Sequence, residues 1–295
     1  MSNIKKRLKL RQSTNWKTLS NEDLEKEYNP SSIIGGNYQP YIEQYITRSE
    51  IAQNQLISTE CRYGPKSSNK LNLFIPKGAS QEKPCPLMVF IHGGYWQELS
   101  KNESQFAAID FVEENIAFAA IDYTLCPHAT LTEIIDECEL AIKWLINNDN
   151  NFIYNSKKIY ISGSSAGAHL AAMCAINISK ISGIVLVSGI YDLEPIVNTT
   201  INDLIGLNES SAFDVSPLFK DLRNVPNTII AWGEIEPLEF KEQSINFAKA
   251  LRAYDTKVET LEICNRNHFD VIFDLGDYNE KLGKKVINMI KGKNS

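Results

Sequence analysis

Short apolar runs recur along the sequence and alternate with stretches of helical periodicity. The strand-like runs are at 56–63, 70–76, 86–92, 116–123, 158–163, 183–189, 227–233 and 257–263. The helical patterns after the second run are at 103–115, 130–147, 166–178, 239–254 and 279–291. Near-continuous hydrophobicity means burial on both faces, which is typical of a parallel sheet covered by helices. The alternation therefore predicts a doubly wound α/β fold.

The beginning of the chain and one long insertion depart from this alternation. The first two runs have the spacing of an antiparallel pair joined by a turn at Gly64-Pro65. Helices are predicted before them, at 19–28, where Ser20 and Asp23 form a start signal, and at 38–53. The segment 190–226 interrupts the pattern. We expect it to form, with the N-terminus, a small cap over the edge of the sheet where ligands of such folds bind.

Composition limits the number of domains that we expect and the kinds of partner that the chain can bind. The chain has 295 residues, 43% of them hydrophobic, which suffices for a sizeable core. Without repeats or a low-complexity linker, we expect a single domain over 19–295, preceded by a flexible tail over 1–18 that carries a basic run. A net charge of −6 disfavours nucleic-acid binding. No run approaches the roughly 18 apolar residues of a membrane span, and no apolar stretch of a secretory signal follows the basic run.

The six cysteines are scattered and contain no C-x-x-C pair, and Cys85, Cys138 and Cys174 lie in segments that look like buried strand or helix. This pattern fits a reduced, cytoplasmic protein better than a disulfide scaffold or a zinc module. We therefore expect a small-molecule substrate as the partner, with neither nucleic acid nor a membrane. A homodimer is left open as an alternative.

The pentapeptide Gly163-Ser164-Ser165-Ala166-Gly167 fits the pattern G-x-S-x-G. Such a match is weak on its own, but this one directly follows the run KIYIS and opens the apolar helical stretch AGAHLAAMCAI. A nucleophile elbow is a sharp turn between a strand and a helix, and the pentapeptide lies in such a position. The glycines at both ends avoid clashes in so tight a turn. Ser165 is therefore the predicted nucleophile, at a helix N-terminus that favours negative charge.

A serine hydroxyl needs a base to accept its proton and an acid to orient that base. The sequence offers four histidines. His92 precedes a glycine pair, and His128 lies in a loop that contains proline. His169 lies within the helix after the elbow, where a packing or hydrogen-bonding role is expected. His268 follows the last predicted strand on a loop that returns to the same edge of the sheet, so it is the predicted base.

The acid should follow the preceding strand, where the sequence offers Glu234, Glu236 and Glu239. Glu234 is close enough to the strand to lie on its turn, and Glu239 is expected to begin the next helix. Glu236 is three residues beyond Gly233, from where a carboxylate can reach the far nitrogen of His268. We therefore predict Glu236 as the acid. The resulting order of serine, glutamate and histidine is the chain order of α/β-hydrolases.

The stretch FIHGGYW at 90–96 places two glycines between a buried strand and two aromatic residues. Attack on a carbonyl creates an oxyanion that must meet preorganised N–H donors. Gly93 and Gly94 allow the backbone to turn its N–H groups toward the space above Ser165 and leave room for a substrate. The N–H of Ala166, next after the nucleophile, is the remaining predicted donor.

The aromatic residues that follow the glycines are expected to wall the substrate pocket. We assign His92, Tyr95 and Trp96 to substrate binding. The alternative interpretation is a plain Gly-Gly turn with buried aromatic side chains.

At these residues the sequence resembles a known family. HGGYW, GSSAGAH and NHFD together resemble the kynurenine formamidases (arylformamidases), α/β-hydrolases related to hormone-sensitive-lipase-type esterases. The likeness extends to LSNEDLEKEYNPS, SKNES, LVSGIYDLEPIV and EFKEQS, so it covers nearly the whole chain. The resemblance implies an α/β-hydrolase fold with a mostly parallel sheet of about eight strands. It carries over a triad of Ser165, Glu236 and His268 and an oxyanion loop from His92 to Trp96.

Two positions depart from the family pattern. The acid of the family is commonly aspartate, and here Glu236 stands in its place. The residue before the nucleophile is often histidine, and here it is Ser164, which we expect to alter the choice of substrate. Glutamate serves as the acid in other α/β-hydrolases, so activity is expected to survive.

The resemblance implies hydrolysis of N-formyl-L-kynurenine to L-kynurenine and formate through a formyl-serine intermediate. Neither a metal nor an organic cofactor is required. We expect short aryl esters to be cleaved as well. One alternative is a carboxylesterase or another small aryl-amide hydrolase that uses the same residues. The other is a non-catalytic binding protein on this fold, although such proteins tend to lack a member of the triad.

Overall fold

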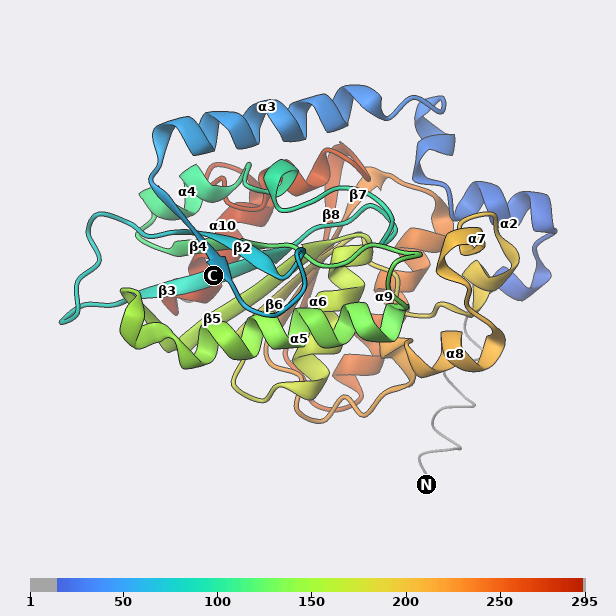
Figure 1. Ribbon diagram of the computed structural model, residues 1–295. Helices are drawn as coiled ribbons and strands as arrows, with labels where there is room; N and C mark the ends of the chain where they lie inside the picture. Colours follow the sequence, from blue (N-terminus) through green and yellow to red (C-terminus); the bar gives the residue numbers. More distant parts are fainter. Residues whose placement is uncertain (1–14, 294–295) are drawn as a thin grey trace.

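The structure, a computed structural model, describes residues 15–293. Within this range one sheet has the strand order β1-β2-β4-β3-β5-β6-β7-β8 (Figure 1). The strands are β1 Ser58–Arg62, β2 Lys70–Phe74, β3 Cys85–Ile91, β4 Ala117–Ile121, β5 Tyr154–Ser164, β6 Gly183–Val187, β7 Thr228–Ile235 and β8 Val258–Asn267. β1, β2 and β4 pair antiparallel, and every other pair is parallel. The predicted mostly parallel sheet and its antiparallel first pair are confirmed.

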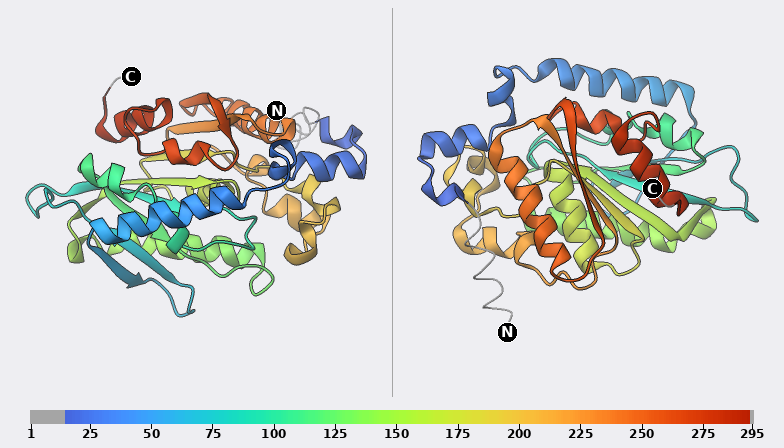
Figure 2. Two further views of the ribbon diagram at one scale, coloured as in Figure 1. Left: turned by 90° about the horizontal axis from the view of Figure 1, so that it is seen from above. Right: turned by 180° about the vertical axis from the view of Figure 1, so that it is seen from behind.

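Helices cover both faces of this sheet (Figures 1 and 2). The α-helices are α2 Asn21–Glu27, α3 Gln39–Gln55, α4 Ala108–Glu113, α5 Leu131–Asn147, α6 Ala166–Asn177, α7 Asn202–Ile205, α8 Glu209–Asp214, α9 Leu238–Arg252 and α10 Lys281–Lys291. The short 3-10 helices are η1 Asn15–Thr18, η2 Pro30–Ile34, η3 Asn102–Ser104, η4 Asp149–Asn151, η5 Glu194–Asn198, η6 Pro217–Phe219 and η7 Val271–Asp274. Apolar residues of α5, α6 and α9 form the core on one face, and those of α3, α4 and α10 form the core on the other.

Strand β3 shows how the sequence produces this two-sided core. Leu87, Val89 and Ile91 lie in the core beside α5 and α6, whereas Met88 and Phe90 lie in the opposite core. Successive side chains of a strand point to opposite faces, so a strand buried on both sides must be apolar at every position. This explains why the runs predicted from sequence are continuous rather than alternating.

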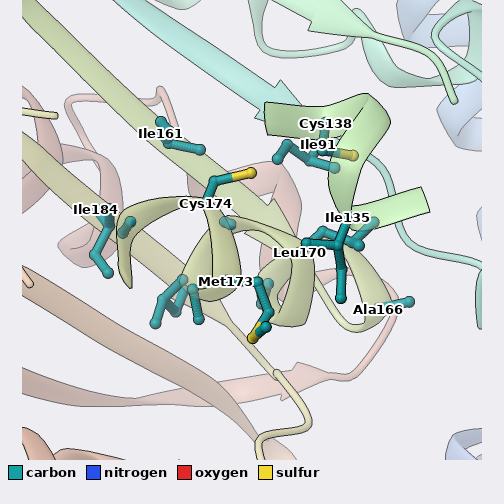
Figure 3. Close-up of a cluster of buried hydrophobic side chains, with 14 of the residues drawn as sticks. Ile91, Ile135, Cys138, Ile161, Ala166, Leu170, Met173, Cys174 and Ile184 are labelled. Atoms are coloured by element: carbon teal, nitrogen blue, oxygen red, sulfur yellow. The ribbon is translucent and has the colours of Figure 1, made fainter. Parts of the chain in front are cut away.

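Helix α6 is buried on all sides, which suits the helix that carries the predicted elbow. Its side chains Leu170, Met173 and Cys174 are buried among residues of the sheet and of α5 (Figure 3). Strand residues Ile161 and Ile184 belong to the same cluster. The N-terminus of α6 is thereby fixed relative to the strand that precedes it.

The cap consists of two segments that are distant in sequence. The segment 190–226 contains η5, α7, α8 and η6, and α2 of the N-terminal region lies beside η5 and α9 (Figure 1). The main-chain N–H of Thr200 donates to Oε2 of Glu25 at 2.9 Å. The predicted cap from the N-terminus and the insertion is therefore present.

The N-terminal boundary and one helix differ from the predicted ranges. Residues 1–14 of the predicted tail lie outside the described range, and residues 15–18 form η1. Ser20 caps α2 as predicted, because its hydroxyl accepts from the N–H of Asp23 at 3.1 Å. The predicted helix 103–115 is shorter, since the N–H of Gln105 donates to the hydroxyl of Ser49 instead of a helical carbonyl. Within residues 15–293, no helix has the length and apolarity needed to cross a membrane.

Candidate active site

The predicted elbow is a strained turn between β5 and α6. Ser165 has φ 56° and ψ −121°, a conformation that serine rarely adopts, and its N–H donates to the carbonyl of Val187 at 2.8 Å. A Cβ on Gly163 would lie 2.1 Å from the carbonyl oxygen of Gly167, and one on Gly167 would lie 2.0 Å from that of Ile91. Both glycines are therefore required by close backbone approach.

The structure brings His268 and Glu236 together. Nδ1 of His268 lies 3.1 Å from Oε2 of Glu236, and both side chains are buried. The rings of Phe240 and Phe269 pack edge-on against the imidazole, with centroid distances of 4.6 and 5.4 Å. Since Nδ1 faces the carboxylate, Nε2 is the nitrogen left to act on a substrate-side group. His268 and Ser165 line the same cavity.

The second oxygen of Glu236 is held by two donors. The N–H of Gly233 donates to Oε1 at 2.5 Å, and the hydroxyl of Ser188 donates to it at 2.6 Å. Oε2 is thereby oriented toward His268. Ser188 directly follows β6, and nothing in the sequence around it distinguished it from an ordinary serine after a strand.

The other two glutamates considered as the acid have different surroundings. Glu234 is exposed on β7, and its carboxylate accepts the N–H of Asn265 at 2.9 Å. Glu239 is buried in the first turn of α9, as expected from its position. Burial raises the pKa of Glu239 to about 7, with a further contribution from the carboxylate of Glu27. Of the three glutamates, Glu236 is the one whose carboxylate contacts His268.

The first glycine of the pair lies directly against the elbow. A Cβ on Gly93 would lie 2.9 Å from the carbonyl oxygen of Ser164 and 3.3 Å from Cβ of Ser165, so only glycine fits there. Gly94 has φ 88°, a region that glycine adopts without cost. Ala166 is the first residue of α6, so its N–H has no acceptor within the helix. Main-chain donors from two segments therefore lie next to Ser165.

His92 and Tyr95 hold the glycine loop in place. Nδ1 of His92 lies 3.0 Å from the carbonyl oxygen of Gly93, and its ring stacks on Tyr123 at 4.1 Å. The hydroxyl of Tyr95 donates to the carbonyl of Tyr28 at 2.5 Å, which ties the loop to the N-terminal region. Both predicted residues line the cavity.

The prediction that Trp96 walls the pocket is wrong. Its side chain is completely buried, and it is not among the residues that line the cavity. Tyr95 and Trp96 both have positive φ, at 49° and 59°, so the chain turns back and carries the indole beneath the loop. There it packs edge-on against His169, with ring centroids 5.1 Å apart.

His169 has the structural role predicted for it. Its Nε2 lies 2.8 Å from the carbonyl oxygen of Val215, and burial lowers its pKa to about 4. The imidazole is therefore neutral at ordinary pH and connects α6 to the cap. His128 is exposed in its loop and lies outside the cavity.

The cavity in front of Ser165 has a volume of about 270 Å³ and largely aromatic walls. The aromatic side chains that line it are Tyr38, Tyr45, Phe90, Tyr95, Phe106 and Phe269. Tyr38 stacks on Phe269 at 5.5 Å. Sequence reasoning missed Tyr38 and Tyr45, although the spacing of tyrosines at 38, 41 and 45 on one helical face was a signal that could have found them.

The charges around this cavity are negative. Glu25 and Glu98 line it, and among its lining residues in the described part of the chain there is no lysine or arginine. Ser164, which stands where the family often has histidine, is nearly buried and also lines the cavity. The site is therefore an apolar, aromatic chamber with carboxylates at its margin.

A serine on a tight strand–helix turn, sharing a cavity with a carboxylate-bound imidazole at the C-terminal edge of a parallel sheet, is the arrangement of an α/β-hydrolase. Solved structures agree with this class. An esterase of the archaeon Pyrobaculum calidifontis superposes with a TM-score of 0.72 at 17% identity, covering 92% of this chain and 97% of the esterase. A protein of Silicibacter sp. tm1040 with a provisional thioesterase assignment superposes with a TM-score of 0.79 at 25% identity. The match covers 89% of this chain and 98% of the Silicibacter chain.

Sequence comparisons identify the family. Residues 71–251 match the BD-FAE family. A kynurenine formamidase of Danio rerio is 30% identical, covering 94% of this chain and 99% of the relative. A kynurenine formamidase of Salmo salar is 29% identical, covering 93% of this chain and 98% of the relative. The chain belongs to the kynurenine formamidase family, and it is a hydrolase of amide or ester bonds.

Proposed function

We propose that the protein hydrolyses N-formyl-L-kynurenine to L-kynurenine and formate, a step of tryptophan degradation, with Ser165, His268 and Glu236 as its triad. The observation that carries this proposal is the buried His268–Glu236 pair, whose imidazole lines one cavity with Ser165 on its strained turn. The substrate is suggested by the relatives that are named kynurenine formamidase.

The first half of the reaction transfers the formyl group to the enzyme. Nε2 of His268 accepts the proton of the Ser165 hydroxyl while the serine oxygen attacks the formyl carbon. Main-chain N–H groups of Gly93, Gly94 and Ala166 stabilise the resulting oxyanion. His268 then donates its proton to the departing aniline nitrogen, which releases kynurenine. Glu236 stabilises the imidazolium throughout this half-reaction.

The second half hydrolyses the formyl-serine. A water molecule loses its proton to Nε2 of His268 and attacks the formyl carbon, and the same N–H groups stabilise the second oxyanion. The proton returns to the oxygen of Ser165, and formate leaves. The aryl ring of the substrate assists the first half, because it withdraws electron density from the leaving nitrogen.

The cavity is suited to an aryl amide. Its aromatic walls offer stacking partners for the aniline ring of the substrate. The substrate also has an ammonium group, for which Glu25 and Glu98 are suitable neighbours.

The decisive test is formate release from N-formyl-L-kynurenine by the purified protein. We expect turnover by the wild type and a loss of ~10⁵-fold or more in Ser165→Ala, since removing the nucleophile disables the whole triad. Circular dichroism of the variant should match the wild type. Formate release at the wild-type rate by Ser165→Ala would remove this serine from the mechanism.

One observation favours a second candidate, a carboxylesterase of uncharged aryl esters. Formylkynurenine has a carboxylate, yet none of the described residues lining the cavity is lysine or arginine. Measuring kcat/KM for formylkynurenine and for 4-nitrophenyl acetate separates the two functions. We expect both compounds to be cleaved, with formylkynurenine preferred. Cleavage of the ester alone would assign the carboxylesterase function.

A further inference from the structure

Two adjacent parallel strands, β5 and β6, are each followed directly by a serine with a positive φ. Ser165 follows β5 with φ 56°, and Ser188 follows β6 with φ 51°. The mechanism above uses Ser165 and leaves Ser188 without a role. Ser188 is completely buried, and its N–H donates to the carbonyl of Ala231 on β7 at 2.8 Å. A positive φ is strained for a non-glycine residue and is retained where the surroundings require it.

The hydroxyl of Ser188 donates to the carboxylate of Glu236. Its Oγ lies 2.6 Å from Oε1 of Glu236. The N–H of Gly233 donates to the same oxygen, which identifies Oε1 as an acceptor and the Ser188 hydroxyl as the second donor. Oε2 is left to face Nδ1 of His268. One oxygen of the Glu236 carboxylate thus anchors the side chain, and the other contacts the imidazole.

Glutamate needs this anchoring more than aspartate does. Its side chain has one more rotatable bond, and each bond adds conformations in which the carboxylate does not face the histidine. Two donors on one oxygen fix both the position and the plane of the carboxylate. A hydrogen bond to a charged group is stronger than one between neutral groups.

We propose that Ser188 is a positioning residue of the reaction, whose hydroxyl holds Glu236 so that its second oxygen orients His268. The proposal rests on the triad put forward under the proposed function. The side chain of Glu236 is long enough to reach this anchor, which lies directly beyond the end of β6.

The primary experiment measures hydrolysis of 4-nitrophenyl acetate by Ser188→Gly. Glycine removes the hydroxyl but suits a positive φ, so the fold and the N–H contact to Ala231 are retained. We expect kcat to fall by about 10- to 100-fold with KM within twofold, as expected for loss of a buried hydrogen bond to a charged group. The matched control is Ser162→Ala, another fully buried serine, which lies on β5 and is expected to keep kcat within twofold.

A double-mutant cycle tests whether the hydroxyl acts through Glu236. Glu236→Asp withdraws the carboxylate by about 1.5 Å, one carbon–carbon bond, from the Ser188 hydroxyl. In this background Ser188→Gly should lower kcat by less than about threefold, because the contact is already lost. An undiminished effect of Ser188→Gly would show that the hydroxyl acts elsewhere and would overturn the proposal.

A spectroscopic measurement excludes a purely structural effect. The proton between Nδ1 of His268 and Glu236 should give a low-field proton NMR signal that shifts or broadens in Ser188→Gly and stays in place in Ser162→Ala. Wild-type kcat in Ser188→Gly, or an unchanged signal, overturns the positioning role. The underlying triad is checked separately with Ser165→Ala: if that variant retains ester hydrolysis, the proposed mechanism fails, whatever Ser188→Gly does.

Discussion

Two buried glutamates three residues apart, Glu236 and Glu239, have opposite surroundings. Glu236 is surrounded by donors: the N–H of Gly233, the hydroxyl of Ser188 and the imidazole of His268. Burial raises the pKa of Glu239 to about 7, and the charges that add to this effect are those of other carboxylates, of which Glu27 contributes most. Burial alone therefore does not identify a catalytic carboxylate. The hydrogen bonds that it makes, above all the contact with His268, do so.

Among the variants that test this comparison, Glu236→Gln is expected to have the largest effect on kcat. The amide keeps the shape of the side chain but loses the charge that stabilises the imidazolium and fixes its tautomer, so kcat should fall by about 10³- to 10⁴-fold. The matched control is Glu234→Gln, on the exposed end of β7, which should stay within about threefold. Steady-state kinetics on 4-nitrophenyl acetate checks both variants. The reverse ranking would transfer the role of the acid to Glu234.

A smaller effect is expected from Gly233→Ala, which disturbs a donor without changing the carboxylate. A Cβ at this position would lie 2.4 Å from the carbonyl oxygen of Arg266, so the backbone between β7 and β8 must shift. We expect kcat to fall by about tenfold and the free energy of unfolding to fall by about 2 kcal/mol. Kinetics and urea unfolding measure the two quantities. A variant with wild-type kcat would show that the donor from Gly233 is dispensable.

The smallest effect on activity is expected from Glu239→Gln, which should act on stability alone. The pKa of Glu239 is about 7 in the folded protein against a usual value of 4.5, so the folded state binds its proton more tightly than the unfolded state. The stability of the wild type therefore falls as pH rises from about 4.5 to 7. The glutamine variant lacks this penalty and should be more stable at pH 8 by about 1–3 kcal/mol.

Urea unfolding at pH 8 and at pH 5 measures this difference. The advantage of Glu239→Gln over the wild type should shrink toward pH 5, where the wild-type carboxyl is protonated in the folded state. Its kcat should stay within twofold of the wild type. A large loss of kcat would place Glu239 in the reaction and would remove the contrast with Glu236.

The sheet and the contact between Glu236 and His268 could be predicted because both depend on local pattern. A strand covered on both faces must be apolar along its length, and the loops after parallel strands meet at one edge. That edge brings together residues that follow β5, β7 and β8. The choice of Glu236 over Glu234 and Glu239 required only the distance of each from the end of its strand.

The remaining features depend on contacts that no local pattern contains. The pairing of Ser188 with Glu236 requires knowing where two side chains 48 positions apart point. The position of Trp96 after the glycine pair predicts a place in the pocket wall, but two positive φ angles in succession turn its side chain into the core. Tyr38 was missed because its contact with Phe269 depends on how the N-terminal region folds over the sheet.

The N-terminal region supplies part of the cavity wall but none of the proposed triad. Tyr38, Ile42 and Tyr45 precede the first strand and line the cavity, whereas every residue of the proposed triad lies beyond position 160. Part of the cavity wall is therefore encoded in a stretch of the gene that is separate from the codons of the proposed triad. Evolution, or an engineer, can remodel that part of the wall through codons 38–45 while the codons of the three residues are inherited intact.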